Sequence, residues 1–402
     1  MKIRLNNILY FTLIMCMISA CKGFWGDKTD LSFIEIPTAT TKPVSYVPIQ
    51  PVITGFTKPV DIVPGFDELI YVVDAGANLL ISYNEAFETS SKETFSIQGI
   101  TDVAQNRVFD ILALGTTDTV IGGKTLRMAT LYILELKKDK STYGLKHASI
   151  KQKIIHPFYF TTSLKQTDTL VRFTGVAILA DNSYYISRTG VSNVSSQFGG
   201  PDDAVIYFDK NNNYVSNISV TNAIGTQADY FKVPNGIVTQ VQPPQAPKLS
   251  PSRFFAYISI SKTLSIKVQP ITHSVVDESD VYQLDRTYAS ADTSKAQSFI
   301  FDANKFSYPE DIIVAGDGTG YIFVVDSDKD SLYQFTSTGL EGVNPPPGSV
   351  SKKNIKVSFG GLGSSLYQFN NPMGVAYYNK TLYIADAGNQ RIVRYKLTTD
   401  IR

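Results

Sequence analysis

Residues 369–395 read FNNPMGVAYYNKTLYIADAGNQRIVRY, and this stretch determines the fold that we expect for the whole chain. It starts with a Pro two residues before a Gly-Val step and continues into an apolar run that ends at Asp386. An aromatic residue, Tyr395, follows nine positions after that Asp. Apolar, aromatic and β-branched runs bounded by Asn, Asp and Gly are typical of β-strands, so the stretch predicts three successive strands.

Six short apolar strands expected along the chain open on the same step, an Asp or Gly followed by Val or Ile. In three copies the second strand ends on an Asp, namely Asp74, Asp326 or Asp386, with an aromatic nine positions later. Units of about 40 residues or more cannot bury their own apolar faces, so the copies must pack against each other. Six units of four antiparallel strands predict an all-β, six-bladed β-propeller. The six openings are Asp61-Ile62, Asp102-Val103, Gly175-Val176, Gly236-Ile237, Asp311-Ile312 and Gly374-Val375.

Two segments, 369–376 and 383–395, together resemble a complete NHL repeat, and the units that begin near Gly55 and Phe306 resemble looser copies. The resemblance covers about residues 55–397 and implies a six-bladed propeller of NHL type. It implies no particular activity, because one fold hosts many functions. We expect no nucleic-acid partner, since the formal net charge is only +1 and such binding needs a basic surface.

The N-terminal 20 residues are expected to be a signal peptide. Lys2 and Arg4 precede an apolar run over residues 8–18, which is too short to span a bilayer. The run ends in Ile-Ser-Ala-Cys, which resembles a bacterial lipobox and implies cleavage before Cys21 and acylation of that residue, with palmitate among the lipids expected. The alternative is an ordinary signal peptide followed by an incidental Cys. The domains predicted are a lipoprotein signal peptide at 1–20, a lipidated Pro-rich tether at 21–54 and the propeller at 55–402.

A lipid on Cys21 would hold the protein on a membrane surface. Lys22 stands where lipoproteins retained in the inner membrane carry an acidic residue, and this resemblance favours the outer membrane of a Bacteroidota-like or similar diderm cell. The sequence leaves open whether the protein faces the periplasm or the outside.

The last unit lacks a fourth strand of its own. It reaches its third strand at residues 391–397, and only five residues remain after that. An open propeller would leave a bare strand edge. We therefore expect an N-terminal strand, from residues 31–36 or from residues 44–54, to close the ring.

Three acidic residues, Asp61, Asp102 and Asp311, begin innermost strands and are the candidate site in the central channel. One reading is a hard cation such as calcium held by their carboxylate oxygens. The reading that we favour is that each carboxylate accepts backbone N–H groups or holds a channel water, because three acids spread around a wide ring do not converge on one ion. The metal is therefore unassigned, and no other cofactor is expected.

The Asp residues that end the second strand have a structural interpretation. We expect the carboxylates of Asp74, Asp326 and Asp386 to accept N–H groups of the following turn, as Asp commonly does. In the third unit Arg188 takes this place. Either the turn of that unit has been rebuilt or the alignment of the repeat shifts there.

The sequence favours a function without catalysis. Its three histidines, His147, His156 and His273, fall outside the expected inner strands, and neither a nucleophile elbow nor a phosphate-binding loop is present. We expect a protein-binding scaffold or an accessory subunit of a cell-envelope complex, bound to an outer-membrane partner. The alternatives are a metal-dependent hydrolase or lyase with its site in the channel, or a glycan-binding lipoprotein, which the single Trp disfavours.

Three long insertions are the candidate binding loops. Residues 242–252 are expected to connect the first two strands of the fourth unit, and residues 269–295 and 336–352 to connect third and fourth strands. By strand parity all three belong to one face. Long loops on a rigid scaffold commonly carry binding function.

Overall fold

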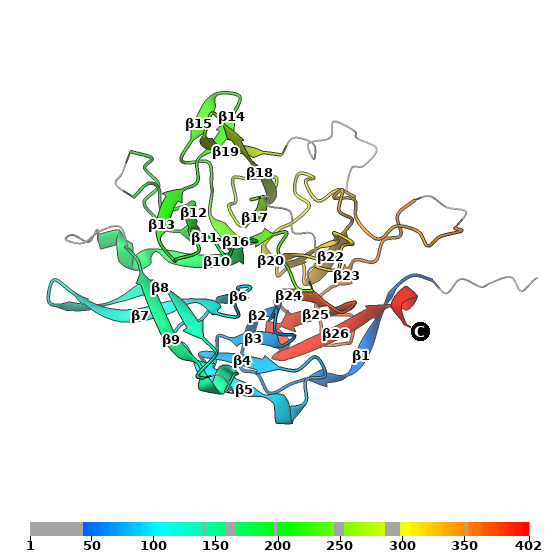
Figure 1. The fold of residues 1–402 in the computed structure, drawn as a ribbon. Coiled ribbons are helices and arrows are strands. Elements are labelled where there is room, and N and C mark those ends of the chain that lie inside the picture. Colours follow the sequence, from blue (N-terminus) through cyan, green and yellow to red (C-terminus); the bar gives the residue numbers. More distant parts are fainter. Residues whose placement is uncertain are drawn as a thin grey trace, which may run out of the picture. The chain divides into compact units, whose positions relative to one another are not determined.

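The computed structural model describes residues 43–139, 142–157, 166–196, 199–244, 253–285, 298–349 and 353–401. The chain divides into Met1–Pro43 and Val44–Arg402, and the second unit is the folded body. Its six sheets surround a central axis as the blades of a propeller (Figure 1). The prediction of an all-β, six-bladed β-propeller is confirmed. Cys21, the signal peptide and residues 31–36 lie outside the described residues.

The six blades follow each other in chain order, and the four strands of a blade run outward from the axis in chain order except in blade 6, where β1 is outermost. Blade 1 comprises β2 (Pro59–Pro64), β3 (Ile70–Asp74), β4 (Leu79–Tyr83) and β5 (Glu93–Ser96); blade 2 comprises β6 (Asp102–Gln105), β7 (Ile111–Ile121), β8 (Lys124–Glu135) and β9 (Ser149–Ile155). Blade 3 comprises β10 (Arg172–Ile178), β11 (Tyr184–Thr189), β12 (Ala204–Phe208) and β13 (Tyr214–Asn217); blade 4 comprises β16 (Pro234–Thr239), β17 (Phe255–Ser259), β18 (Val268–Val276) and β19 (Ser279–Leu284). Blade 5 comprises β20 (Pro309–Val314), β21 (Ile322–Asp326), β22 (Ser331–Phe335) and β23 (Phe359–Gly360); blade 6 comprises β24 (Pro372–Tyr378), β25 (Thr381–Asp386), β26 (Arg391–Leu397) and β1 (Tyr46–Ile53).

The apolar core lies between the blades. Buried apolar side chains form six clusters, one in each interface between neighbouring blades. Blade 6 meets blade 1, for example, through Tyr383 and Ile62. Because each sheet packs on a neighbour on both faces, its middle strands read as apolar runs without alternation, and all five residues of β3 are buried. The repeat therefore folds only as a closed ring.

The ring is closed by β1, the first strand in the sequence, which lies beside β26, the last strand (Figure 1). Tyr46 pairs with Leu397, and the antiparallel ladder breaks between Ile49 and Ile53. The Tyr46 hydroxyl also donates a buried hydrogen bond of 2.6 Å to Gln334 of blade 5. Of the two segments expected to close the ring, residues 44–54 therefore supply the strand.

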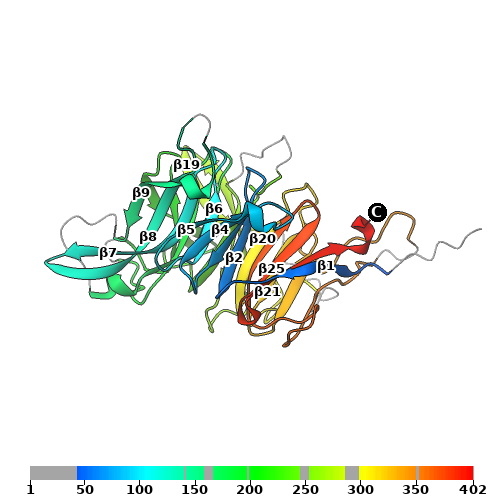
Figure 2. The ribbon, with the colours of Figure 1, turned by 90° about the horizontal axis from the view of Figure 1, so that it is seen from below.

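Two hairpins extend the blades beyond four short strands. The turn between β7 and β8 is carried outward as a two-stranded arm, residues 116–128, which projects past the neighbouring strands (Figure 2). Within the described residues, the ladders to β6 and β9 stop at Leu114 and Thr130, so the arm has no further strand partner. A second hairpin, β14 (Val220–Asn222) and β15 (Gly225–Gln227), adds to the outer edge of blade 4.

The expectation for residues 269–295 was wrong. Residues Val268–Val276 and Ser279–Leu284 form β18 and β19, and the acidic residues Asp277 and Glu278 make the tight turn between them with positive φ angles of 47° and 63°. Asp at such a position tolerates the left-handed conformation that the turn requires. A tight turn therefore stands where a long loop between the third and fourth strands was expected.

Helical structure is limited to short 3-10 turns in the part of the chain that the structure describes. No helix in these segments is long and apolar enough to cross a membrane. The turns are η2 (Thr89–Ser91), η3 (Leu145–His147), η4 (Gln166–Leu170), η7 (Ala387–Asn389) and η8 (Thr398–Asp400).

Candidate functional site

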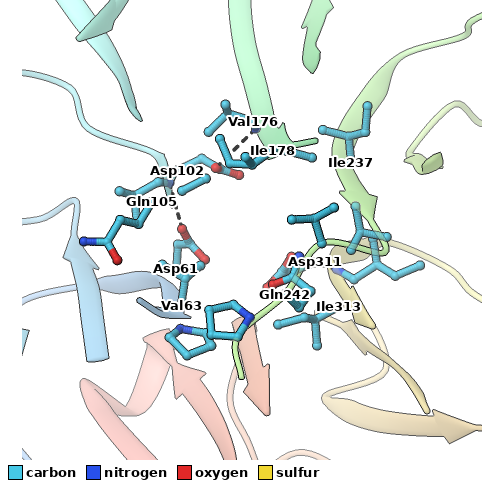
Figure 3. Close-up of a pocket in the computed structure, with 18 of the residues that line it drawn as sticks. Asp61, Val63, Asp102, Gln105, Val176, Ile178, Ile237, Gln242, Asp311 and Ile313 are labelled. Atoms are coloured by element: carbon cyan, nitrogen blue, oxygen red, sulfur yellow. Dashed lines mark hydrogen bonds between the residues drawn. The ribbon is translucent and has the colours of Figure 1, made fainter. Parts of the chain in front are cut away.

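The three predicted channel acids do lie around the axis of the propeller. Figure 3 shows Asp61, Asp102 and Asp311 pointing toward the channel from the inner strands of blades 1, 2 and 5. Each carboxylate reaches the inner strand of the next blade and accepts a backbone N–H there. The bonds run from Val103 to Asp61 at 3.0 Å, from Val176 to Asp102 at 3.3 Å and from Val375 to Asp311 at 2.8 Å.

The other three blades carry Gly at the same position, and at two of them, Gly374 and Gly175, the next strand comes close enough to replace the carboxylate bridge. A Cβ added to Gly374 would lie 2.7 Å from the Cα of Asp61, and one added to Gly175 would lie 3.0 Å from the Cα of Gly236. Real Cβ atoms do not approach backbone so closely, so the chain needs Gly at these positions. Asp and Gly in the repeat are thus two ways of joining neighbouring inner strands.

Burial determines how the channel acids titrate. It raises the pKa of all three carboxyls, and repulsion from Asp311 adds to the effect on Asp61. The pKa of Asp311 is raised to about 6, against the opposing effect of the N–H bonds from Val375 and Ile312. The folded channel therefore favours the protonated form of these groups.

The part of the channel beyond the acids is narrow. A cavity of about 50 Å³ lies there, lined by residues two positions after the openings, such as Val63, Val238 and Ile313. Gln242 and Pro243 of the loop after β16 line the same cavity (Figure 3), and their carbonyl oxygens come so close to Gly316 that a Cβ there would lie 2.3 Å and 2.5 Å from them. This space holds a few waters and no larger ligand.

On the other side of the acids the channel widens into a cavity of about 480 Å³, which we call the funnel. Its wall contains the residue immediately before each of the six Asp or Gly residues that open the inner strands. In five blades this residue forms a β-bulge between the first and second strands. A bulge re-aims a side chain, which explains why consecutive residues can both face the axis. The six residues, which we call the wall ring, are Val60, Thr101, Thr174, Asn235, Glu310 and Met373.

Polar residues of the wall ring are held in place by neighbouring blades. The Asn235 amide donates to Glu310 at 3.0 Å and to the Pro309 carbonyl at 3.1 Å, and the Ser327 hydroxyl donates to the other oxygen of Glu310 at 3.0 Å. Burial raises the pKa of Glu310, and these hydrogen bonds and the nearby Lys58 act in the opposite direction. The funnel wall is therefore ordered before any ligand enters.

No group of three or more His, Cys, Asp or Glu side chains among the described residues is arranged to hold a metal ion. Two channel acids, Asp61 and Asp311, also accept the N–H of the residue that follows them, each at 2.7 Å. Their oxygens are thus used by the backbone, in keeping with the reading favoured from the sequence.

The Asp residues at the ends of the second strands bind the segment that enters their own blade, and not mainly the turn that follows them. Asp74 accepts the N–H groups of Thr57 and Lys58 at 2.8 Å and 2.7 Å, and Asp326 does the same for Ser307 and Tyr308 at 2.6 Å and 3.1 Å. The turn joins in through the N–H of Lys329 at 3.1 Å in blade 5 and through the side-chain amide of Asn389, which donates to Asp386 at 2.8 Å, in blade 6.

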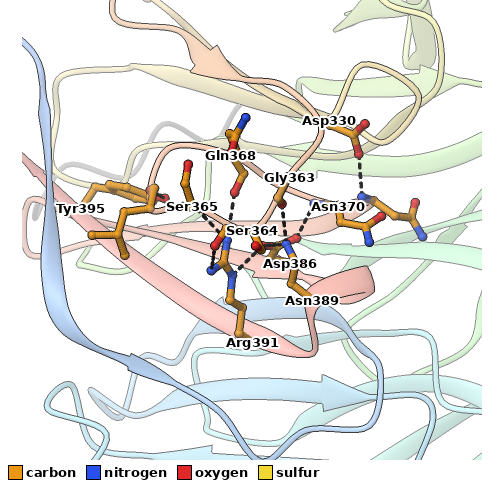
Figure 4. A network of polar contacts seen from close by, with 12 residues as sticks. Asp330, Gly363, Ser364, Ser365, Gln368, Asn370, Asp386, Asn389, Arg391 and Tyr395 are labelled. Carbon is orange, nitrogen blue, oxygen red and sulfur yellow. Dashed lines mark hydrogen bonds and ion pairs between the residues drawn. The ribbon is translucent and has the colours of Figure 1, made fainter.

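Blade 6 adds a guanidinium to this arrangement. Asp386 accepts the N–H of Asn370 and a 2.7 Å bond from Arg391, whose other nitrogens donate to three loop carbonyls (Figure 4). The pair is buried, with side-chain exposures of 10% for Arg391 and 0% for Asp386. The carbonyls belong to Ser364, Ser365 and Gln368.

Arg188 lies in register with these Asp residues, so the repeat alignment holds and the turn of blade 3 has been rebuilt. It pairs with Phe173 and Ala204, as Asp74 pairs with Pro59 and Leu79. Its fully buried guanidinium donates to carbonyl groups of the inserted loop, at 2.6 to 3.2 Å. The acceptors are Gly199, Pro201 and Asp202.

The histidines lie away from the channel axis. His156 is fully buried, with its Nε2 3.2 Å from Asp168, and its ring meets the edge of Phe173 of the funnel wall. His273 is hydrogen bonded to Asp280 at 2.7 Å on blade 4, and His147 ends η3. None of them lines the funnel or the channel.

Sequence reasoning missed the funnel. The signal that could have found it lies in the residues just before the six Asp or Gly residues that open the inner strands. These residues are Thr, Asn, Glu, Val and Met in different units, whereas a purely structural position would repeat one residue type. Lys58, Arg172 and Tyr308, which lie two residues further back, also line the funnel and were missed for the same reason.

The comparisons with known proteins report on the fold. No family model matches the chain, and no curated protein matches it. A solved luciferin-regenerating enzyme superposes with a TM-score of 0.51 at 10% identity, over 87% of this chain and 95% of that chain. An auxiliary nutrient binding protein from Bacteroides thetaiotaomicron has a TM-score of 0.48 at 10% identity, over 85% and 70% of the two chains. Virginiamycin B lyase from Staphylococcus aureus has a TM-score of 0.44 at 10% identity, over 88% and 99%. At such identities these likenesses concern the fold and no activity.

Proposed function

We propose that this protein is a non-catalytic binding protein of the cell envelope, held on the outer membrane by a lipid on Cys21. The observation that carries the proposal is the use of the channel acids: Asp61, Asp102 and Asp311 each bridge to the next blade through backbone N–H groups. Asp61 and Asp311 use both oxygens in this way and Asp102 uses one, which supports a role in joining the blades rather than in acid-base catalysis or metal binding. The open surface above them is left for binding.

The face that carries the funnel is the binding face that we propose. The arm of residues 116–128 projects there, since its base at Gly115, Thr116 and Ala129 lines the funnel. Val120 near the tip is 68% exposed, and an unpaired two-stranded ribbon offers edges for a partner. The partner of this arm is a protein of the envelope.

A crosslinked pulldown from membranes tests the proposal. We expect stoichiometric recovery of an outer-membrane protein by the full chain, and loss of that protein when residues 116–128 are replaced by a two-residue turn. Shortening the loop at 336–352, which lies on the opposite face, is the matched control and should leave recovery unchanged. Recovery of no partner, together with turnover of a lactone or ester panel, would overturn the proposal in favour of a channel enzyme.

The lipid anchor has its own test. Mass spectrometry of the mature protein should find acylated Cys21 without residues 1–20, and Cys21→Ala should release the protein from the membrane. An unmodified N-terminus at another position would contradict the anchor while leaving the binding function untouched.

A further inference from the structure

The funnel has the size and enclosure of a site for a small molecule. Its volume of about 480 Å³ falls within the range of about 300 to 1,000 Å³ typical of ligand pockets. It is bounded by the starts of six inner strands, whose backbones are engaged in blade pairing. A peptide usually binds along a free strand edge or a groove, so this round cavity suits a compact ligand better than a chain.

The wall of the funnel is polar on one side and apolar on the other. Thr101, Thr174, Asn235 and Glu310 come from the consecutive blades 2 to 5 and present hydroxyl, amide and carboxylate groups. Val60 and Met373, with Ala75, come from the adjacent blades 1 and 6 and form an apolar strip. A ring that carries hydroxyl groups at its edge and C–H groups on its face matches such a wall.

Two cations lie at the mouth of the funnel. Lys58 of blade 1 and Arg172 of blade 3 are exposed, line the cavity, and form no ion pair within the described residues. Burial raises the pKa of Glu310 and of Tyr308, which both lie in blade 5. The charge of Lys58 acts against the shift of Glu310, and the charge of Arg172 acts against the shift of Tyr308. Both side chains line the cavity, so an anionic group that enters the funnel is attracted to its wall by two positive charges.

The acids at the floor do not exclude an anionic ligand. Burial raises the pKa of Asp61, Asp102 and Asp311, which favours the protonated, uncharged form of these groups. The positive charge at the mouth is thus only partly offset from below.

We propose that the funnel binds a small hydroxylated carboxylic acid of the kind that a uronic acid represents. The carboxylate lies between Lys58 and Arg172, and the hydroxyl groups bond to Glu310, Asn235 and Thr174. This inference rests on the proposed function in one respect, that the protein binds and does not catalyse. It assigns a small ligand to the funnel, which lies on the same face as the arm.

Isothermal titration calorimetry of the purified protein tests the inference. D-glucuronic and D-galacturonic acid are the probes, and their methyl esters and parent sugars are the controls. We expect the acids to bind and the uncharged esters to bind roughly tenfold or more weakly, as loss of a charge-assisted contact predicts. Lys58→Gln and Arg172→Gln should each weaken acid binding by a similar factor while leaving ester binding nearly unchanged. Lys210→Gln, in the exposed turn between β12 and β13 on the opposite face, is the matched control and should change neither.

Three outcomes would overturn the inference. These are equal binding of acid and ester, retention of acid binding in Lys58→Gln and Arg172→Gln, and binding of N-acetyl-dialanine but of no uronic acid. A failed titration leaves the envelope-partner proposal standing, because the pulldown depends on the arm. Turnover of a bound uronic acid would instead contradict the non-catalytic function and keep the ligand class.

Discussion

The carboxylate of Asp311 in blade 5 accepts a 2.8 Å hydrogen bond from the backbone N–H of Val375 in blade 6, 64 residues later in the chain. The bond joins two inner strands that share no ladder, so it acts between blades and not within one. Asp61 and Asp102 make the same bridge, while Gly374 and Gly175 let the next inner strand pack closely against their own strand. Neighbouring inner strands are therefore joined by a carboxylate bridge at three junctions and by close backbone packing at two others.

Stability should decrease as the pH rises through the range in which Asp311 titrates. Its pKa is raised from 3.8 to about 6, so the folded state holds the proton more tightly than the unfolded chain does. The stabilising contribution is complete below about pH 3.8 and is lost as the pH rises through about 6. Urea unfolding of Asp311→Asn between pH 4 and pH 8 should show a correspondingly flatter profile than the natural protein.

Asp229→Asn is the matched control for this measurement, because Asp229 is an exposed acid outside the channel. Its pH profile should follow that of the natural protein. If Asp311→Asn also keeps the natural slope, the channel acid does not titrate as described.

Gly374→Ala should destabilise the junction between blades 6 and 1 more than Gly236→Ala destabilises its own junction. The added Cβ at residue 374 would meet backbone, 2.7 Å from the Cα of Asp61, whereas at residue 236 its nearest neighbour is the end of the Ile258 side chain at 3.1 Å. Overpacking against immobile backbone costs about 1 to 3 kcal/mol, and a side-chain end can move aside. Equilibrium unfolding in urea measures the free energy of unfolding of both variants. Equal losses of stability would contradict the close approach of Gly374 to the backbone of Asp61.

Arg391→Ala should cost about 3 to 5 kcal/mol in the free energy of unfolding, because it leaves Asp386 and three loop carbonyls buried without their partner. Arg127→Ala is the control, since Arg127 also bonds an Asp, at 2.9 Å, but the pair is exposed on the arm and its loss should not be measurable. Adding Asp386→Asn to Arg391→Ala should cost less than the sum of the single changes. Additive losses would mean that the two side chains act independently.

Removal of β1 should open the ring. A chain that begins at residue 54 should unfold with a free energy lower by at least about 3 kcal/mol than one that begins at residue 43, because the edge of β26 is exposed and the buried aromatic contacts of Tyr46 are lost. Tyr46→Phe removes only the hydrogen bond to Gln334 and should cost about 1 kcal/mol. Equal melting temperatures of the two truncated chains would show that β1 does not hold the ring closed.

The sequence alone predicted the architecture because the repeat is local. Each Asp/Gly step, apolar run and turn lies within one blade, and local periodicity determines strand and turn without knowledge of the neighbours. Only a closed ring buries both faces of every such sheet, so six copies also predicted six blades. The position of the channel acids followed from the same repeat, since equivalent residues occupy equivalent places in equivalent blades.

The tertiary structure decided whatever depends on residues distant in the chain. Tyr46 pairs with Leu397 across the whole body, and no local pattern distinguished this strand from residues 31–36. The wall ring required the bulges before the openings, which strand periodicity does not reveal because a bulge breaks that periodicity. Arg188 could replace an Asp only because the loop at 199–202 turns its carbonyls inward. The composition of the funnel is likewise a product of ring closure, which brings together six residues that are separated by 40 to 75 positions in the chain.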